Sequence, residues 1–278
     1  MRRRTASIAL AAALVPLAVA GTTAAATDRS SAAIGSTASV AKPNTHRLVP
    51  APGQLLARRN ATVVSTNWSG YAVVANGITD VRSTFVVPKT KAFPSGFAST
   101  WTGIGGYNTG DLIQAGVAEE AGGNYYAWYE ILPASATPIT GCSGDAGCSV
   151  RPGDKTYIRI LQVGTNLWNV LIINNGHGVS WRWSRDIPYK SSRSSAEWVL
   201  EAPTVGGAQS TLQNVGNVHF GPQSLYKVGN GAFRTIAAGN PVRIVLQQAG
   251  VRQATPSALG ASGQQFNDCS YKRTCPAP

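Results

Sequence analysis

Carboxylate side chains are scarce in this sequence, so those inside apolar segments are the first candidates for chemistry. Glu130 lies in Tyr-Tyr-Ala-Trp-Tyr-Glu-Ile-Leu-Pro, and Glu197 and Glu201 lie in Ser-Ala-Glu-Trp-Val-Leu-Glu-Ala-Pro. Because side chains alternate between the two faces of a strand, Glu197 and Glu201 are predicted to share one face, as are Trp128 and Glu130. Paired carboxylates on one face suit glycoside hydrolysis. A solvated sheet face is the simpler alternative.

A glutamine stands in a similar setting. Leu112, Gln114 and Gly116 alternate within the apolar run Leu-Ile-Gln-Ala-Gly-Val, so they are predicted to share a face. Burying a side-chain amide without hydrogen-bond partners costs free energy. Gln114 is therefore unusual for a purely structural strand residue.

Several common kinds of catalytic site are excluded by the sequence. It contains no His-Glu-x-x-His and no Gly-x-Ser-x-Gly, and no Gly-rich phosphate loop precedes a helix. We interpret His177 as a hairpin-tip residue and His219 as a strand residue that packs or bonds locally. We therefore expect neither a metal nor another cofactor.

The four cysteines form two closely spaced pairs. Cys142 and Cys148, and likewise Cys269 and Cys275, are each separated by five residues. For an exported chain we predict the two local disulfides among the three possible connectivities. The alternative, a four-thiolate zinc site, has less support because the spacing exceeds the usual Cys-x₂₋₄-Cys.

The segments that must position these residues have the pattern of an all-β protein. Short alternating or apolar runs are separated by turn signals such as Asn76-Gly77, and no long 3.6-residue apolar period is present. The strands are predicted at 68–74, 81–87, 99–104, 112–117, 125–132, 155–163, 167–174, 179–185, 196–201, 212–220 and 242–247. Many short strands at near-regular spacing favour a sandwich or barrel.

The start of the chain is predicted to be a secretory leader. Three arginines precede the apolar run Ala6 to Ala20, and Ala-x-Ala sites follow, so residues 1–26 are interpreted as a signal peptide. Residues 27–59, rich in Ala, Ser, Thr and Pro, are predicted to be a pro-segment or linker, and residues 60–278 the β-sandwich domain. We expect N-terminal sequencing of the active form to start between about residues 55 and 67.

The net charge of +12 belongs largely to that leader. Residues 1–59 hold eight Lys or Arg and one acid, which leaves 16 basic and 11 acidic residues, or +5, in the predicted domain. No cluster of Lys and Arg is present, so the charge does not indicate nucleic-acid binding. The run at 6–20 is short for a membrane anchor, so a soluble, secreted, extracellular protein is expected.

Four segments, in this order, resemble the glutamic peptidases, or eqolisins. They are Asn67-Trp68-Ser69-Gly70; Trp101-Thr102-Gly103-Ile104 leading to Leu112–Val117; Tyr126-Ala127-Trp128-Tyr129-Glu130; and Ala196-Glu197-Trp198-Val199-Leu200-Glu201. The resemblance covers about residues 62–263. It implies that Gln114 and Glu201 are the catalytic pair and that Glu197 is not.

The resemblance also implies the rest of the functional hypothesis. It implies a sandwich of two large antiparallel sheets with a cleft on the concave face, and an acid-acting endopeptidase made with a pro-segment. Trp68, Trp101, Trp128 and Glu130 would line or support the cleft. Polypeptides are the expected substrates and a monomer the expected state. Gly105, Ala118 and Tyr126 stand where fungal members often have acids.

Two alternatives come from other classes of protein. A carbohydrate-binding sandwich would also present Trp side chains on a sheet face. A glycoside hydrolase would use Glu130 with Glu201.

Overall fold

The computed structural model of the chain describes residues 43–44, 48–54, 56, 59–176 and 178–278. The predicted signal peptide, most of the predicted pro-segment and His177 lie outside the described residues. None of the described residues forms a helix long and apolar enough to cross a bilayer.

The described chain is almost entirely β-structure, with one short 3₁₀ turn, η1 (Ala237–Gly239). The longer strands are β2 (Thr62–Ser65), β3 (Trp68–Val74), β4 (Ile78–Val86), β5 (Phe97–Gly105), β6 (Leu112–Glu120), β7 (Asn124–Ile131), β9 (Lys155–Gly164), β10 (Leu167–Gly176), β11 (Val179–Pro188), β12 (Ser195–Glu201), β15 (Asn217–Phe220), β16 (Leu225–Val228), β18 (Val242–Gln248), β19 (Val251–Pro256) and β20 (Phe266–Ser270). Two-residue strands are β1 (Pro43–Asn44), β8 (Thr137–Pro138), β13 (Thr204–Val205), β14 (Ala208–Gln209) and β17 (Arg234–Thr235).

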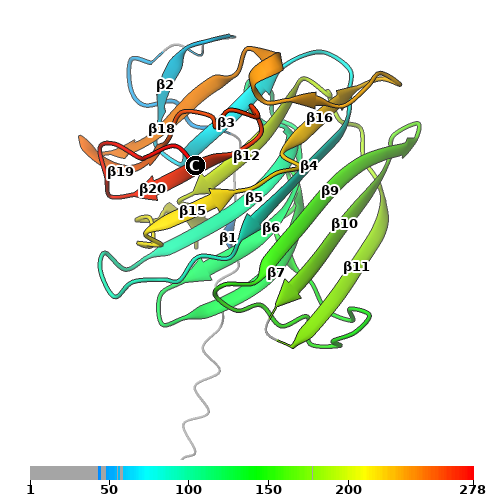
Figure 1. Cartoon of the computed structure of the whole chain (residues 1–278), viewed down its shortest axis with the longest axis horizontal. Coiled ribbons are helices and arrows are strands. Elements are labelled where there is room, and N and C mark those ends of the chain that lie inside the picture. The colour runs from blue at the N-terminus through cyan, green and yellow to red at the C-terminus, as the bar shows by residue number, and fades with distance from the viewer. Residues whose placement is uncertain (1–42, 45–47, 55, 57–58, 177) are drawn as a thin grey trace, which may run out of the picture. The chain divides into compact units, whose positions relative to one another are not determined.

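The strands form two layers of a sandwich, which confirms the predicted fold class. In the first layer the pairing order is β7–β6–β5–β12–β3–β18, and every neighbouring pair is antiparallel. In the second layer β11, β10, β9 and β4 pair in that order, and β15, β20 and β19 continue it. The hairpin of β18 and β19 joins the two layers along one edge. Figure 1 shows β4 and β9 in front of β5 and β6.

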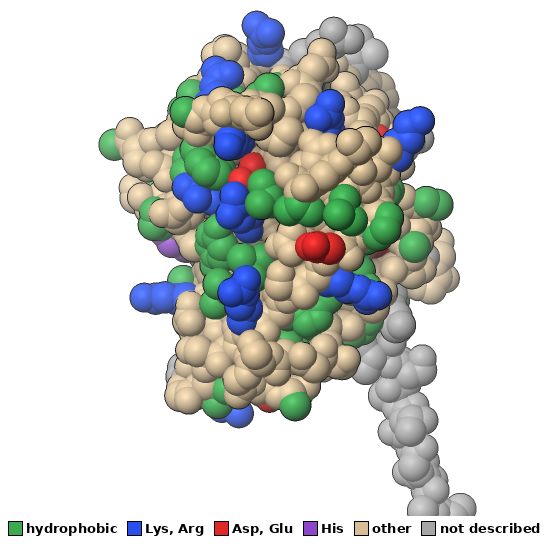
Figure 2. Space-filling view, turned by 90° about the vertical axis from the view of Figure 1, so that its right-hand side faces the viewer, with side chains coloured by type: hydrophobic (Ala, Val, Ile, Leu, Met, Phe, Trp, Pro, Cys, Tyr) green, Lys and Arg blue, Asp and Glu red, His purple; other side chains and the backbone are tan. Residues whose placement is uncertain are grey.

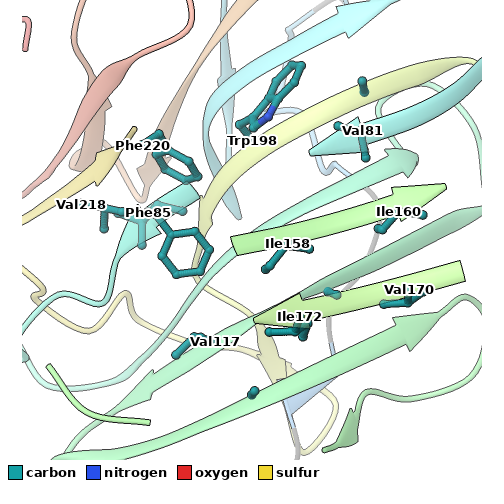
Figure 3. Close-up of a cluster of buried hydrophobic side chains, with 14 of the residues drawn as sticks. Val81, Phe85, Val117, Ile158, Ile160, Val170, Ile172, Trp198, Val218 and Phe220 are labelled. Atoms are coloured by element: carbon teal, nitrogen blue, oxygen red, sulfur yellow. The ribbon is translucent and has the colours of Figure 1, made fainter. Parts of the chain in front are cut away.

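The main hydrophobic core fills the space between the layers. The first layer contributes Trp198 and Val117, and the second contributes Phe85, Ile158 and Val170, all buried (Figure 3). On β12 and β6 these core residues alternate with residues of the opposite face, as the two-residue period predicts. The outer face of the first layer is therefore free to carry a different set of side chains.

That outer face carries a second buried apolar cluster. It contains Trp68, Trp101, Trp128, Val199 and Tyr107 together with Leu48, which precedes the first long strand. Three buried indoles on one outer sheet face are unusual for a face in contact with water. The candidate site lies within this cluster.

Both predicted disulfides are confirmed. Cys142 bonds Cys148 and Cys269 bonds Cys275, each with S–S 2.02 Å, so the zinc alternative is wrong. Neither bond lies on the face that carries the second cluster's indoles. They close small loops at 142–148 and at the end of the chain.

The acidic residues are mostly internal, so the surface is basic. Eight of the eleven acids in residues 60–278 are buried: Asp80, Glu119, Glu120, Glu130, Asp154, Glu197, Glu201 and Asp268. Figure 2 accordingly shows more Lys and Arg than Asp and Glu on the face it presents. Among these acids, Asp80 forms a salt bridge with Arg159 at 2.5 Å.

Candidate active site

The strand register of the first layer places the predicted site residues on one face. Glu201 on β12 lies directly opposite Trp68 on β3 and Ser99 on β5. Gln114 on β6 lies opposite Gly103 on β5 and Glu130 on β7. Because directly opposed residues of antiparallel strands point to the same side, Glu201, Gln114 and Glu130 all project from the outer face.

Two glycines make room for the side chains of this face. A Cβ at Gly116 would lie 2.5 Å from both the Thr100 carbonyl oxygen and Trp101 Cβ. A Cβ at Gly103 would lie 3.0 Å from the Trp101 ring and 3.1 Å from Gln114 Cβ. The contacts at Gly116 are closer than a side-chain carbon tolerates, so the Gln-x-Gly spacing has a steric reason, and those at Gly103 are tight.

Gln114 and Glu130 are hydrogen-bonded to each other. Gln114 Nε2 donates to Glu130 Oε2 at 2.5 Å, and both side chains are buried. A carboxylate only accepts, so the atom of the amide that faces it must be the nitrogen. Glu130 therefore fixes which way the Gln114 amide points.

Glu201 is held by donors from strand β5 and from the bend just before β3. Trp101 Nε1 donates to its Oε2 at 2.8 Å, and Asn67 Nδ2 donates to its Oε1 at 3.3 Å. Burial raises the pKa of the Glu201 carboxyl well above its ordinary value, and the nearby Glu130 raises it further. The indoles of Trp101 and Trp68 and the Asn67 amide act in the opposite direction.

The three predicted cleft tryptophans are all fully buried on this face. The Trp68 and Trp101 rings meet edge to face, with centroids 4.8 Å apart. Trp128 lies opposite Gly116 on the neighbouring strand. The indoles therefore give this face an apolar lining, and Trp101 also supplies an N–H donor to Glu201.

Glu197 shares this face but lies farther along its strand. It is opposite Ala72 and Gly103, four residues before Glu201, which is about 13 Å at 3.3 Å per residue. Burial, with a smaller contribution from Asp111, raises its pKa well above the ordinary value. The structure therefore does not pair Glu197 with Glu201.

The sequence predicts no role for Asn67 at this site. Asn67 was part of a matching segment, but its contact with Glu201 depends on a fold that joins residues 134 positions apart. Its position directly before Trp68 was the only signal available. Within the described ranges, no group of three or more His, Cys, Asp or Glu is arranged to hold a metal ion.

The peptidase A4 family profile matches residues 66–266, which include every candidate residue above. The chain belongs to the peptidase A4 family. It is 24% identical over 199 residues to aspergillopepsin-2 of Aspergillus niger, covering 62% of this chain and 69% of that protein. It is 25% identical over 157 residues to scytalidopepsin B of Scytalidium lignicola, covering 55% of this chain and 58% of that protein.

The fold of this A4 chain is also found in a solved structure. Scytalido-glutamic peptidase, solved with a transition-state analog inhibitor, superposes with a TM-score of 0.60 at 18% identity, over 74% of this chain and 98% of that one. The family match makes the A4 chain a peptide-bond hydrolase and implies polypeptide substrates. This family match argues against the two alternatives, a carbohydrate-binding protein and a glycoside hydrolase.

Proposed function

We propose that this chain is an endopeptidase in which Glu201 and Gln114 are the catalytic pair. One observation carries the proposal: a carboxyl and an amide project from the same face of one sheet, each oriented by a partner, inside a cluster of indoles. The hydrogen bonds that orient both groups offset the free-energy cost of burying them. Both side chains are fully buried here, so substrate enters when the residues that cover them move aside.

The proposed reaction begins with Glu201 as a general base. Ionised Glu201 takes a proton from a water molecule while the water oxygen bonds to the scissile carbonyl carbon. The carbonyl π electrons move to oxygen, and the Gln114 Nε2–H donates a hydrogen bond to that oxyanion. Protonated Glu201 then gives its proton to the amide nitrogen as the C–N bond breaks, and the carbonyl re-forms. The products are a carboxylic acid and an amine.

An amide hydrogen-bond donor is compatible with catalysis at acidic pH. A hydrogen bond from Gln114 does not titrate, so the oxyanion donor is present at every pH. The general base must be ionised, and burial raises the pKa of Glu201. We therefore propose an acidic pH range whose lower limb lies above the ordinary pKa of a glutamate.

The buried carboxyls offer a second reason for acidic operation. Burial raises the pKa of Glu119 and of Asp268 to about 8. Both are neutral in the folded protein at acidic pH, whereas a charge would develop inside the structure as the pH rises through about 8. The fold is thus better suited to acid than to alkali.

We propose further that the enzyme is secreted, with residues 1–26 as signal peptide and a pro-segment after them. These proposals rest on the sequence pattern of the leader. Local disulfides in both Cys pairs fit an oxidising compartment.

The proposal is tested by incubating purified protein with denatured casein over a range of pH values. Mass spectrometry of the products should show internal cleavages at acidic pH. A Glu201→Gln variant should give none above background, whereas Glu197→Gln should retain them. Pepstatin-like inhibitors should not slow the reaction, because the site offers no pair of aspartates. Absence of peptide products at every pH would overturn the proposed function.

A further inference from the structure

The Asn67 side chain connects the proposed general base to a segment that precedes the first long strand. Its Nδ2 donates to Glu201 Oε1 at 3.3 Å, and its Oδ1 accepts from the backbone N–H of Val49 at 2.9 Å. The Ser65 hydroxyl lies 2.8 Å from the same Oδ1. Glu201 thus accepts from the nitrogen of the Asn67 amide, and Val49 donates to its oxygen.

The segment at residues 48–51, here named the N-terminal strap, is built into the domain. The backbone N–H of Thr66 donates to the Val49 carbonyl at 2.9 Å, and the Ala51 N–H donates to the Val64 carbonyl at 2.9 Å. Leu48 donates to Gly106 at 3.1 Å, and its side chain is buried at 4% exposure. The strap therefore lies along β2 as an additional edge segment.

The strap contributes to the orientation of the Asn67 amide, together with the Ser65 hydroxyl and the Glu201 carboxylate. A backbone N–H is a donor only, so the amide atom that faces Val49 must be the oxygen. The nitrogen then faces Glu201 and can only donate. Without the Val49 N–H, the Asn67 oxygen keeps the Ser65 hydroxyl as a donor but loses its backbone donor, so the amide is held less firmly against Glu201.

We propose that Asn67 is a positioning residue for Glu201 and that the N-terminal strap, which orients Asn67, is retained in the active enzyme. This inference rests on the proposed function of Glu201. It places the maturation cut before residue 48, rather than in the interval of about 55–67 that composition alone favours. The strap is then part of the catalytic domain and not of the removed leader.

Other groups that face Glu201 come from three strands. Glu130 on β7 is the charged group that acts on it, and Trp68 on β3 and Trp101 on β5 are the neutral ones. Leu48 of the strap belongs to the same buried cluster as Trp68 and Trp101, whereas the Val49 N–H acts on Glu201 through the Asn67 amide. An effect of the strap on Glu201 is thereby distinguishable from a change in Glu130.

The test uses two proline substitutions in the full chain. Val49→Pro removes the N–H that binds Asn67, and the Val49 side chain is 40% exposed, so little packing is lost. Ala51→Pro is the matched control, because it removes one backbone N–H of the same strap without touching Asn67. Asn67→Ala and the double variant Val49→Pro/Asn67→Ala complete a cycle.

We expect Val49→Pro and Asn67→Ala each to lower kcat/KM about tenfold, as expected for loss of a hydrogen bond to a charged group. The acidic limb should move to higher pH, because a lost donor raises the pKa of the base. The double variant should match Asn67→Ala, and Ala51→Pro should match the wild type. N-terminal sequencing of the active form should give a start at or before residue 48.

Carbon-13 NMR titration of the Glu201 carboxyl in the same full-length variants measures its pKa, and so the effect of this contact, independently of enzyme activity. Val49→Pro should shift the titration of Glu201 upward, and Ala51→Pro should not. Equal behaviour of the two proline variants, a faster Val49→Pro enzyme, or a fully active form that starts after residue 49 would overturn the inference. Wild-type protein without Glu201-dependent proteolysis would instead refute the proposed function, whatever the titrations show.

Discussion

Gln114 donates its side-chain N–H to Glu130 across two directly opposed positions of neighbouring strands, at 2.5 Å. The pair links the proposed oxyanion donor to a carboxyl that also raises the pKa of the proposed base. An amide nitrogen carries two hydrogens, and Glu130 accepts one of them. The second is the hydrogen that the proposed mechanism assigns to the oxyanion.

Gln114→Ala should lower kcat by about 10²–10³, because one oxyanion donor contributes about 2.7–4 kcal/mol. Glu130→Ala should have a smaller effect, about tenfold, since it removes the partner that orients the amide but not the donor itself. Glu130→Gln keeps an acceptor oxygen and should recover part of that loss. Steady-state kinetics on a fluorogenic peptide distinguishes these cases; equal rates for Gln114→Ala and wild type would contradict the assigned donor.

Gly116→Ala tests the steric reason for the Gln-x-Gly spacing. The added Cβ would lie 2.5 Å from Trp101 Cβ and from the Thr100 carbonyl, so the Trp101 side chain must shift. Because Trp101 holds Glu201, the change should reduce activity more than a surface Gly→Ala does. Gly110→Ala is a suitable control variant, since nothing lies within 4 Å of its Cβ position and its φ is not in the left-handed region. Similar kinetics for the two variants would show that the Trp101 contact is dispensable.

The buried carboxyls predict a definite dependence of stability on pH. Burial raises the pKa of Glu119 and of Asp268 to about 8. At pH values between the ordinary pKa of each group and about 8, the folded state therefore binds more protons than the unfolded state. The free energy of unfolding should therefore fall as the pH rises from about 4.5 to about 8, by about 1.4 kcal/mol per pH unit for each group. Urea unfolding across this range measures the slope.

Glu119→Gln and Asp268→Asn should each flatten this slope. The neutral amide has a similar shape and does not titrate in either the folded or the unfolded state. Asp268 accepts a hydrogen bond from Ser69 at 2.8 Å, so Asp268→Asn also tests whether an amide keeps that contact. A slope that is unchanged in both variants would mean that other groups set the pH dependence.

The disulfide at Cys142–Cys148 should stabilise the fold without affecting catalysis. On the chain-entropy model a seven-residue loop is worth about 2.4 kcal/mol. A Cys142→Ser/Cys148→Ser variant should thus unfold at lower urea concentration and retain wild-type kcat/KM. A loss of activity at temperatures where the variant is folded would be inconsistent with a purely structural bond.

The sequence predicted the site-bearing strands well because each is a short alternating or apolar run bounded by turn residues. The predicted strand at 68–74 coincides with β3, and the shared face of Glu197, Val199 and Glu201 is confirmed. The strand predicted at 212–220 is observed only as β15 at 217–220, because side chains and a left-handed Gly216 organise the residues before it. Strand β20 was missed because its sequence, Phe-Asn-Asp-Cys-Ser, is polar.

The roles of Asn67 and Glu130 at the site needed the structure for a physical reason. Each depends on a hydrogen bond between strands, and spacing along one strand gives no information on which residue lies opposite. The Asn67 orientation depends in addition on Val49, in a segment whose composition indicates a linker. Long-range pairing, not local pattern, determines these contacts.

The central claim is that Glu201 is the general base and that Glu197 is not. Both are buried glutamates on the same strand face, so Glu197→Gln is a matched control for Glu201→Gln. The measurement is kcat/KM on one peptide substrate at the acidic optimum, with circular dichroism to confirm folding. Glu201→Gln should lose about 10²–10⁴ in rate, and Glu197→Gln should stay near wild type. Near wild-type activity in folded Glu201→Gln would contradict the account.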